Sequence, residues 1–229
     1  MKLYYHPVST VCRPIMLFAE EHALDLDYQV IDLFRGEHLD DAFAAINPSR
    51  QVPVLVDGDY QLTESTAILR YLAGECGSSG YPADLRCRSR VDERLDWFNT
   101  GLYRDLGYGF IYPQVFANHR REDAKVNAAV VDWGRDKANA WLRILDAHLI
   151  GPTQPFVCGD EISIADYFGA GVLSLGEVIG LDYRGHQYVS RWFQRMKARS
   201  SWAKVHELFY AALVEPMRGG SYAALRGAA

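Results

Sequence analysis

The chain has 229 residues, of which 49% are hydrophobic and 23% charged, the composition of a globular protein with room for one large domain or two small ones. Its formal net charge of −5 argues against nucleic acid or an anionic membrane as the main partner, and no signal-peptide core or membrane-length apolar run is present. Cys12, Cys76, Cys87 and Cys158 form no CxxC pair, so neither a zinc site nor a disulfide framework is indicated, and we expect a cytoplasmic protein.

The first 76 residues alternate between strand and helix patterns. The predicted elements are strand 2–5, helix 11–21, strand 27–33, helix 38–46, two strands joined by the Asp57-Gly58 turn, and a helix from Ser65 to about Gly74. This β-α-β-α-β-β-α order predicts a small mixed sheet with helices packed on its faces.

A Gly/Ser/Pro-rich segment at 77–85 predicts a linker between two domains. The pattern beyond it is almost wholly helical, with helices predicted over 86–103, 124–149, 188–199 and 201–213. Ser163 and Asp166 have the spacing of a capping box before another apolar run, with Asp in place of the usual Glu. We therefore predict an all-helical second domain, 86–229, whose tail from Arg218 onward is loosely ordered.

Two features of the first domain need an explanation. Pro53 opens a buried-strand pattern although proline cannot donate to a sheet ladder, and Glu64-Ser65 precedes a helix. A trans proline at a strand edge and an ordinary helix cap would account for both features.

The chain resembles the cytosolic glutathione transferases in “NPSRQVPVLVDGDYQLTESTAILRYL” and in the capped “ISIADY”. It resembles their theta class in “YYHPVSTVCRPIMLFAEE”, “DLFRGEHLDDAFAAINP” and “RVDERLDW”. Matching positions are frequent up to about residue 100 and sparser beyond it. The resemblance implies a thioredoxin-like glutathione-binding domain at 1–76, the linker at 77–85, and a helical domain at 86–229.

The resemblance also implies a structural role for Pro53 in binding glutathione. In the family the equivalent proline follows a cis peptide bond, which would turn the backbone of Val52 outward to pair with the cysteinyl part of glutathione. Glu64 would face the ammonium group of the γ-glutamyl end, and Ser65 with its helix N-terminus would bind the carboxylate. His38 and Gln51 match positions that contact the glycine end, where Arg50 adds positive charge.

Catalysis requires glutathione as the thiolate, which is the nucleophilic form. A free thiol with a pKa of about 8.5 is mostly protonated at neutral pH, so the enzyme has to lower this pKa. Theta-class enzymes donate a hydrogen bond to the sulfur from a serine just after the first strand, and alignment places Ser9 there. Thr10 and Cys12 are the alternatives, Cys12 through a mixed disulfide, although we interpret it as a packing residue. Tyr4 and Tyr5 lie within the strand, so we expect them to pack.

The second substrate is expected to bind in an apolar pocket near residues 101–116. The candidate lining residues are Tyr108, Phe110, Tyr112 and Phe116, in a segment that Gly107, Gly109 and Pro113 predict to be a loose helix end or loop. A core-packing role for these aromatic residues is the alternative. The short Gly/Ala-rich tail leaves the presence of a lid over the site open.

The predicted function is a glutathione S-transferase that conjugates glutathione, its co-substrate, to small electrophiles such as alkyl halides and epoxides, without a metal. A glutathione-dependent disulfide or peroxide reductase and a non-catalytic glutathione-binding module are the alternatives. The resemblance also implies a homodimer, with Asp96, Asn99 and Thr100 as candidates to reach the partner's site.

Overall fold

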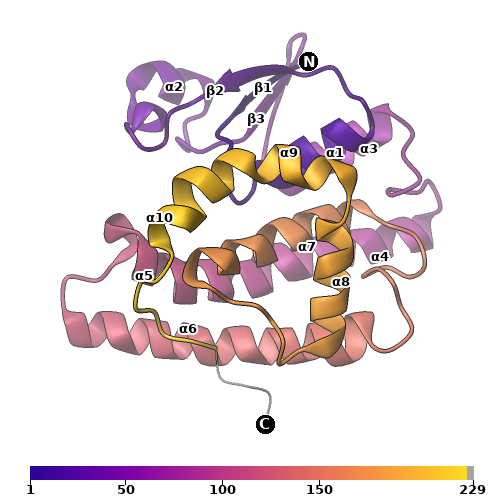
Figure 1. Ribbon diagram of the computed structural model, residues 1–229. Helices are drawn as coiled ribbons and strands as arrows, with labels where there is room; N and C mark the ends of the chain where they lie inside the picture. Colours follow the sequence, from indigo (N-terminus) through magenta and orange to yellow (C-terminus); the bar gives the residue numbers. More distant parts are fainter. Residues whose placement is uncertain (226–229) are drawn as a thin grey trace.

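A computed structural model describes residues 1–225, and its N-terminal part is built on a four-stranded mixed sheet (Figure 1). The strand order is β2-β1-β3-β4, with β1 parallel to β2, and with β3 antiparallel to both β1 and β4. The strands are β1 (Lys2–Tyr5), β2 (Asp27–Val30), β3 (Val54–Asp57) and β4 (Tyr60–Thr63).

Helices lie on both faces of this sheet. On one face α1 (Arg13–Glu21) and α3 (Ser65–Glu75) bury Phe18 and Ile68 against Leu3 and Leu55 of the strands. On the other face Phe43 of α2 (Asp41–Ile46) packs with Val54 and Cys12. The alternation of Val54 and Leu55 between the two clusters follows from the two-residue period of a strand. The short η1 (Glu37–Leu39) is separated from α2 by the extended residue Asp40, where we predicted one helix.

The C-terminal part is a bundle of helices around α7 (Figure 1). Every residue of α7 (Ile164–Ser174) is buried, and its N-terminus carries the predicted capping box. Both the amide nitrogen and the Oγ of Ser163 donate to Asp166 Oδ2 at 2.8 Å. The other segments are α4 (Leu85–Asp96), η2 (Trp97–Ile111), α5 (Tyr112–Val115), η3 (Ala117–His119), α6 (Ala124–Ile144), η4 (Leu145–Ile150), η5 (Leu175–Ile179), α8 (Gln187–Lys197), α9 (Ser200–Phe209), η6 (Tyr210–Val214) and α10 (Glu215–Met217).

The segment from α4 to α5 corrects one sequence-based expectation. A loose helix end or loop was predicted near Gly107, Gly109 and Pro113, but helix continues from Leu85 to Val115, π-helical along η2. The glycines remain in the helix because they allow close packing: a Cβ on Gly134 of α6 would lie 2.3 Å from the carbonyl carbon of Gly109. Pro113 lies within this continuous helix, two residues before it ends at Val115.

The two parts of the chain are packed tightly against each other. Helix α1 contacts α7 and α9, and α3 contacts α7. At this junction the Glu21 carboxylate accepts hydrogen bonds from Arg199 Nε at 2.7 Å, Ser201 Oγ at 2.6 Å and the Tyr167 hydroxyl at 2.6 Å. The sheet domain is therefore held at a fixed position against the helices.

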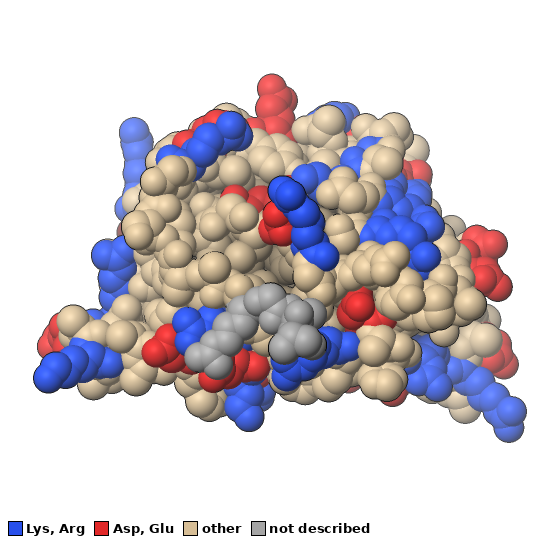
Figure 2. Space-filling view, turned by 60° about the horizontal axis from the view of Figure 1, so that its bottom comes forward, with Lys and Arg blue, Asp and Glu red and all other residues tan. Residues whose placement is uncertain are grey.

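The surface shows little separation of charge on the face that Figure 2 presents. Lys and Arg side chains lie next to Asp and Glu side chains along its lower edge and near its centre, and a further group of basic side chains lies to the right of the centre. Within residues 1–225 no helix is both long and apolar enough to cross a membrane. Of the predicted tail, residues 218–225 contain no helix or strand, whereas 226–229 lie outside the described residues.

Candidate active site

A cavity of about 920 Å³ opens between the sheet domain and the helical part. Its walls come from the loop after β1, the segment before β3, the N-terminus of α3 and the helices η2 and α5. It brings together every residue predicted to bind or activate glutathione: Ser9, His38, Gln51, Val52, Pro53, Glu64 and Ser65.

The peptide bond between Val52 and Pro53 is cis, as the family resemblance implied. Both residues are buried at the cavity wall, directly before β3 begins at Val54. No backbone hydrogen bond joins Val52 to another described residue. The backbone at this point can therefore pair with an extended peptide in the cavity, as one strand pairs with another.

Glu64 and Ser65 form the junction between β4 and α3. Glu64 has φ of +66°, a left-handed conformation that is uncommon for a non-glycine residue and concentrates at functional sites. Its side chain is exposed at the cavity, whereas Ser65 is buried at the first position of the 11-residue helix α3. The free N–H groups of this helix end favour a carboxylate, and the Glu64 carboxylate favours an ammonium group nearby.

His38, Gln51 and Arg50 also line the cavity. His38 Nδ1 is a buried atom with no hydrogen-bond partner within residues 1–225. Arg50, which has φ of +53°, has its Nη2 atom 3.1 Å from Asp41 Oδ1. An unpartnered nitrogen and a guanidinium among the residues that line the cavity suit a second carboxylate, such as the glycine end of glutathione.

Ser9, Thr10 and Cys12 differ sharply in their surroundings. Ser9 is half-buried at the cavity wall, and its carbonyl oxygen accepts hydrogen bonds from the amides of Cys12 and Arg13. Thr10 is buried and its hydroxyl lies 3.0 Å from the hydroxyl of Tyr112. Cys12 is fully buried, and burial raises the pKa of its thiol to about 11. Of the three residues, Cys12 is the least suited to reaction with a bound thiol.

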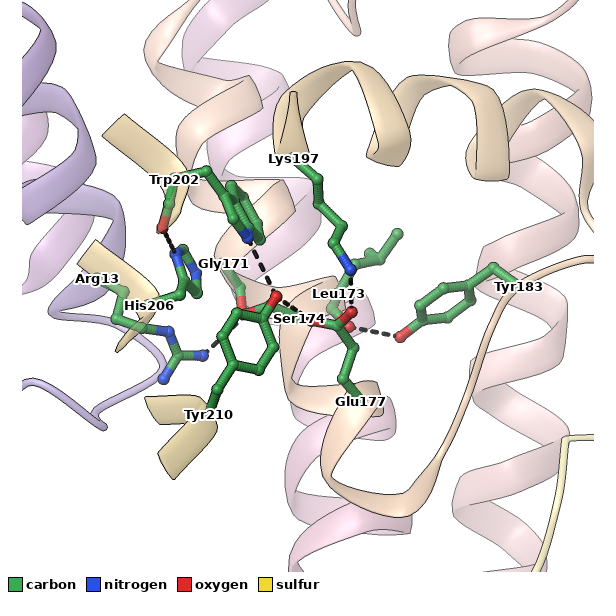
Figure 3. A network of polar contacts seen from close by, with 10 residues as sticks. All are labelled: Arg13, Gly171, Leu173, Ser174, Glu177, Tyr183, Lys197, Trp202, His206 and Tyr210. Carbon is green, nitrogen blue, oxygen red and sulfur yellow. Dashed lines mark hydrogen bonds and ion pairs between the residues drawn. The ribbon is translucent and has the colours of Figure 1, made fainter. Parts of the chain in front are cut away.

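A buried cation lies directly beneath this loop. The fully buried Arg13 guanidinium donates to the carbonyl oxygen of Val8 at 2.5 Å and to Ser174 Oγ at 2.8 Å, and it stacks on the Phe209 ring at 3.7 Å. Figure 3 shows Arg13 pointing toward Ser174, next to the polar chain of Lys197, Glu177, Tyr210 and Trp202. Burial lowers the pKa of Arg13 to about 10, so the guanidinium stays charged at neutral pH.

Aromatic rings line the helical side of the cavity. Tyr108, Tyr112 and Phe116 all line it, and the ring of Tyr112 lies 5.0 Å from that of Tyr108 and 5.4 Å from that of Phe116. Phe110 does not: its side chain is fully buried in the core, because successive positions on a helix face different directions. Its inclusion among the pocket residues was wrong.

Sequence reasoning missed other residues at the cavity. Tyr103 lies one helical turn before Gly107, and His119 lies in the short η3 after α5. The His119 ring packs 4.9 Å from that of Tyr112, and burial lowers its pKa. Asn99 and Thr100, proposed as dimer contacts, also line the cavity, whereas Asp96 pairs with Arg70. The further lining residues include Phe34, Asn47, Ser49, Arg104, Asn118 and Leu175.

The chain matches known families in both of its parts. The N-terminal domain of glutathione S-transferases matches residues 1–74, and their C-terminal domain matches residues 111–200. Mouse glutathione S-transferase theta-1 is 33% identical over 207 residues, which cover 86% of this chain and 82% of that protein.

Solved structures agree with these matches. The apo form of human glutathione S-transferase T1-1 has a TM-score of 0.79 and 31% identity, covering 93% of this chain and 90% of that one. Human glutathione transferase theta-2, in complex with glutathione and an unknown ligand, has a TM-score of 0.84 and 26% identity. The match covers 97% of this chain and 92% of that one.

The fold and the cavity therefore define a two-domain enzyme with a thioredoxin-like sheet domain and a helical domain. The chain belongs to the glutathione S-transferase family and resembles its theta class. This confirms the predicted fold, the predicted transferase and glutathione as co-substrate.

Proposed function

We propose that the protein activates glutathione at Ser9 and transfers the thiolate to a small electrophile. The observation that carries this proposal is that Ser9 shares one cavity with Val52-Pro53 and Glu64-Ser65, while Cys12 is buried away from it. Residues 1–76 form the glutathione-binding domain, 77–85 the linker, and 86–229 the helical domain that supplies the electrophile pocket.

Each end of glutathione has a complementary partner in this proposal. Glu64 and the N-terminus of α3 bind the γ-glutamyl end, the backbone of Val52 pairs with the cysteinyl residue, and His38 and Gln51 bind the glycine carboxylate. This arrangement directs the sulfur to the Ser9 hydroxyl, which donates a hydrogen bond to it. A preorganised donor of this kind stabilises the thiolate more than the thiol and so lowers the thiol pKa.

The electrophile occupies the aromatic side of the cavity, between Tyr108, Tyr112 and Phe116. These rings suit a small apolar or aryl group, with the reactive carbon directed toward Ser9. Alkyl halides and epoxides are the proposed substrates. In each, attack by the thiolate forms a carbon–sulfur bond while the bond from the same carbon to the leaving halide or oxygen breaks.

We infer a cytoplasmic homodimer in which the helix of Asp96, Asn99 and Thr100 lies near the partner's glutathione site. A monomer at micromolar concentration in sedimentation velocity would contradict this assembly.

The experiment that tests the function is glutathione-dependent halide release from an alkyl halide by wild type, Ser9→Ala, Thr10→Val and Cys12→Ala. We expect Ser9→Ala to lose roughly 10²-fold or more in kcat/KM, the scale of deleting one preorganised donor, and Cys12→Ala to remain close to wild type. If Cys12→Ala were the inactive variant, the reaction would be thiol exchange. If neither wild type nor any variant released halide while glutathione still bound, the result would favour a different electrophile or a non-catalytic binding module.

A further inference from the structure

One charged side chain at the cavity has no role in the proposed binding of glutathione. Among residues 1–225 the Asp, Glu, Lys and Arg side chains that line the cavity are those of Glu64, Arg50 and Arg104. In the proposed binding mode the ammonium group of glutathione faces Glu64, and its two carboxylates face the N-terminus of α3 and the region of Arg50. Arg104 has no partner on glutathione and remains available to the second substrate.

A buried acid holds Arg104 in place. The Nε and Nη2 atoms of Arg104 donate to Asp105 Oδ1 and Oδ2 at 2.8 Å and 3.0 Å, and the indole nitrogen of Trp141 donates to Asp105 Oδ2 at 2.7 Å. The Asp105 side chain is fully buried, whereas that of Arg104 is 59% exposed. Burial alone would raise the pKa of Asp105, but the hydrogen bonds from Arg104 and Trp141 outweigh it and hold the pKa below its usual range. The carboxyl group is therefore ionised at neutral pH and fixes the guanidinium.

The guanidinium of Arg104 still has hydrogen-bond donors to offer. It carries five N–H groups, of which the bidentate pair with Asp105 uses two, and the other three make no hydrogen bond within residues 1–225. The charge of Arg104 is also not cancelled by Asp105 alone, because Lys137 of α6 acts on the same carboxylate. A planar guanidinium fixed on one edge matches a carboxylate on its other edge.

Arg104 borders the proposed electrophile pocket. Tyr103 directly precedes it on η2, Tyr108 follows it by about one helical turn, and all three residues line the cavity. An aromatic electrophile that packs against these rings can therefore present a substituent to the guanidinium.

We propose that Arg104 determines specificity by binding a carboxylate on the electrophile, so that the preferred substrates are aryl-alkyl halides with a carboxylate away from the reacting carbon. This inference rests on the proposed function and narrows its substrate class. The glutathione thiolate attacks the halide-bearing carbon, a carbon–sulfur bond forms, and the halide leaves with the electron pair of the broken bond. The carboxylate is unchanged, so Arg104 contacts it equally before and during the reaction and lowers KM more than it raises kcat.

The test compares 4-(chloromethyl)benzoate with its methyl ester, which have the same benzylic carbon and leaving group but differ in charge. We expect Arg104→Gln to lower kcat/KM for the carboxylate at least about 10-fold more than for the ester, mainly through KM, because hydrogen bonds between charged groups are lost. Arg104→Lys, which keeps the charge but not the planar fork, should recover part of this difference. Asp105→Asn, which weakens the hold on Arg104, should shift the ratio in the same direction by a smaller factor.

A second measurement follows carboxylate binding without turnover. Calorimetric titration of the glutathione-loaded protein with 4-methylbenzoate, which has no leaving group, should give a Kd that rises at least about 10-fold in Arg104→Gln. Arg184→Gln is the matched control, because Arg184 is an exposed arginine, 2.6 Å from Asp182, outside the described cavity lining, and it should change neither the ratio nor the Kd.

The outcomes separate this inference from the proposed function. Equal losses on the carboxylate and the ester in Arg104→Gln, or an unchanged ratio and Kd, would overturn the role of Arg104. Failure of wild type to turn over the ester, with Arg104-dependent binding of 4-methylbenzoate intact, would instead count against the proposed function.

Discussion

At the scale of single residues, the most unusual group is the guanidinium of Arg13. It is fully buried, its Nε has no hydrogen-bond partner, and no carboxylate among residues 1–225 forms an ion pair with it. An uncompensated buried charge is costly, so its place directly beneath Val8 and Ser9 calls for a function. A thiolate at Ser9 would supply the missing negative charge.

We predict that Arg13 lowers the thiol pKa of bound glutathione. Replacement by Met keeps most of the side-chain volume but removes the charge, and should raise the thiol pKa by roughly one unit or more, as expected for loss of a nearby opposite charge. The pH profile of kcat/KM and the ultraviolet absorbance of the thiolate measure it. Arg13→Lys, which restores the charge, should recover most of the shift. An unchanged pH profile in a folded Arg13→Met variant would show that the cation acts only on packing.

The site residues that could be predicted from sequence are those in contiguous motifs. Pro53, Glu64 and Ser65 lie within 13 residues of one another, in a segment whose order of elements is itself recognisable. Phe110 was misassigned because an aromatic-rich segment does not say which of its rings face a cavity and which face the core. His119 was missed because a lone histidine after a helix carries no signal of the ring cluster around it.

At the scale of secondary-structure elements, the crossing of α6 over η2 is a close contact between two helix backbones. Gly134 and Gly109 meet there without side chains, and a Cβ on Gly134 would lie 2.3 Å and 2.4 Å from the carbonyl carbon and oxygen of Gly109. Backbone atoms cannot move aside as a flexible side chain can. The two helices approach this closely only because both residues are glycine.

Gly134→Ala is therefore expected to destabilise the protein although alanine favours helix. Separating the two helices should lower the free energy of unfolding by about 1–3 kcal/mol or more, the cost of overpacking a core. Denaturation in urea measures this change. Gly74→Ala is the matched control, because a Cβ on Gly74 of α3 meets nothing within 4 Å, and it should be neutral or stabilising by up to about 1 kcal/mol. Equal behaviour of the two variants would mean that α6 moves freely over η2.

Most of the helices and strands could be predicted because their apolar residues repeat with the period of the element. The pattern failed between residues 104 and 115, where Gly107, Gly109 and Pro113 were interpreted as breaks. Glycine lowers helix propensity locally, but the packing of Gly109 against Gly134 of α6 outweighs that preference. Such long-range contacts leave no periodic signal in the sequence.

At the scale of the whole molecule, the cavity exists only because two domains are fixed against each other. Glu21 at the end of α1 receives hydrogen bonds from Arg199, Ser201 and Tyr167 of the helical part. Burial alone would raise the pKa of Glu21, but these donors outweigh it and hold the pKa below its usual range. A carboxylate whose pKa is depressed by folding stabilises the folded state above the pKa of the unfolded chain, about 4.3 for Glu.

Because folding lowers the pKa of Glu21, the stability of the domain junction depends on pH. At pH 7 Glu21→Gln should lower the free energy of unfolding by about 1–3 kcal/mol, because one charged acceptor is replaced by a neutral amide. The difference should shrink as the pH falls below about 4 and through the folded-state pKa, since Glu21 in wild type is then also uncharged. Urea titrations at pH 7 and at pH 3 measure both values. Glu20→Gln, next to it but exposed with its partner Lys204, should change stability by less than about 1 kcal/mol at either pH. A Glu21→Gln deficit of the same size at both pH values would mean that side-chain packing, not the carboxylate charge, holds the two domains together.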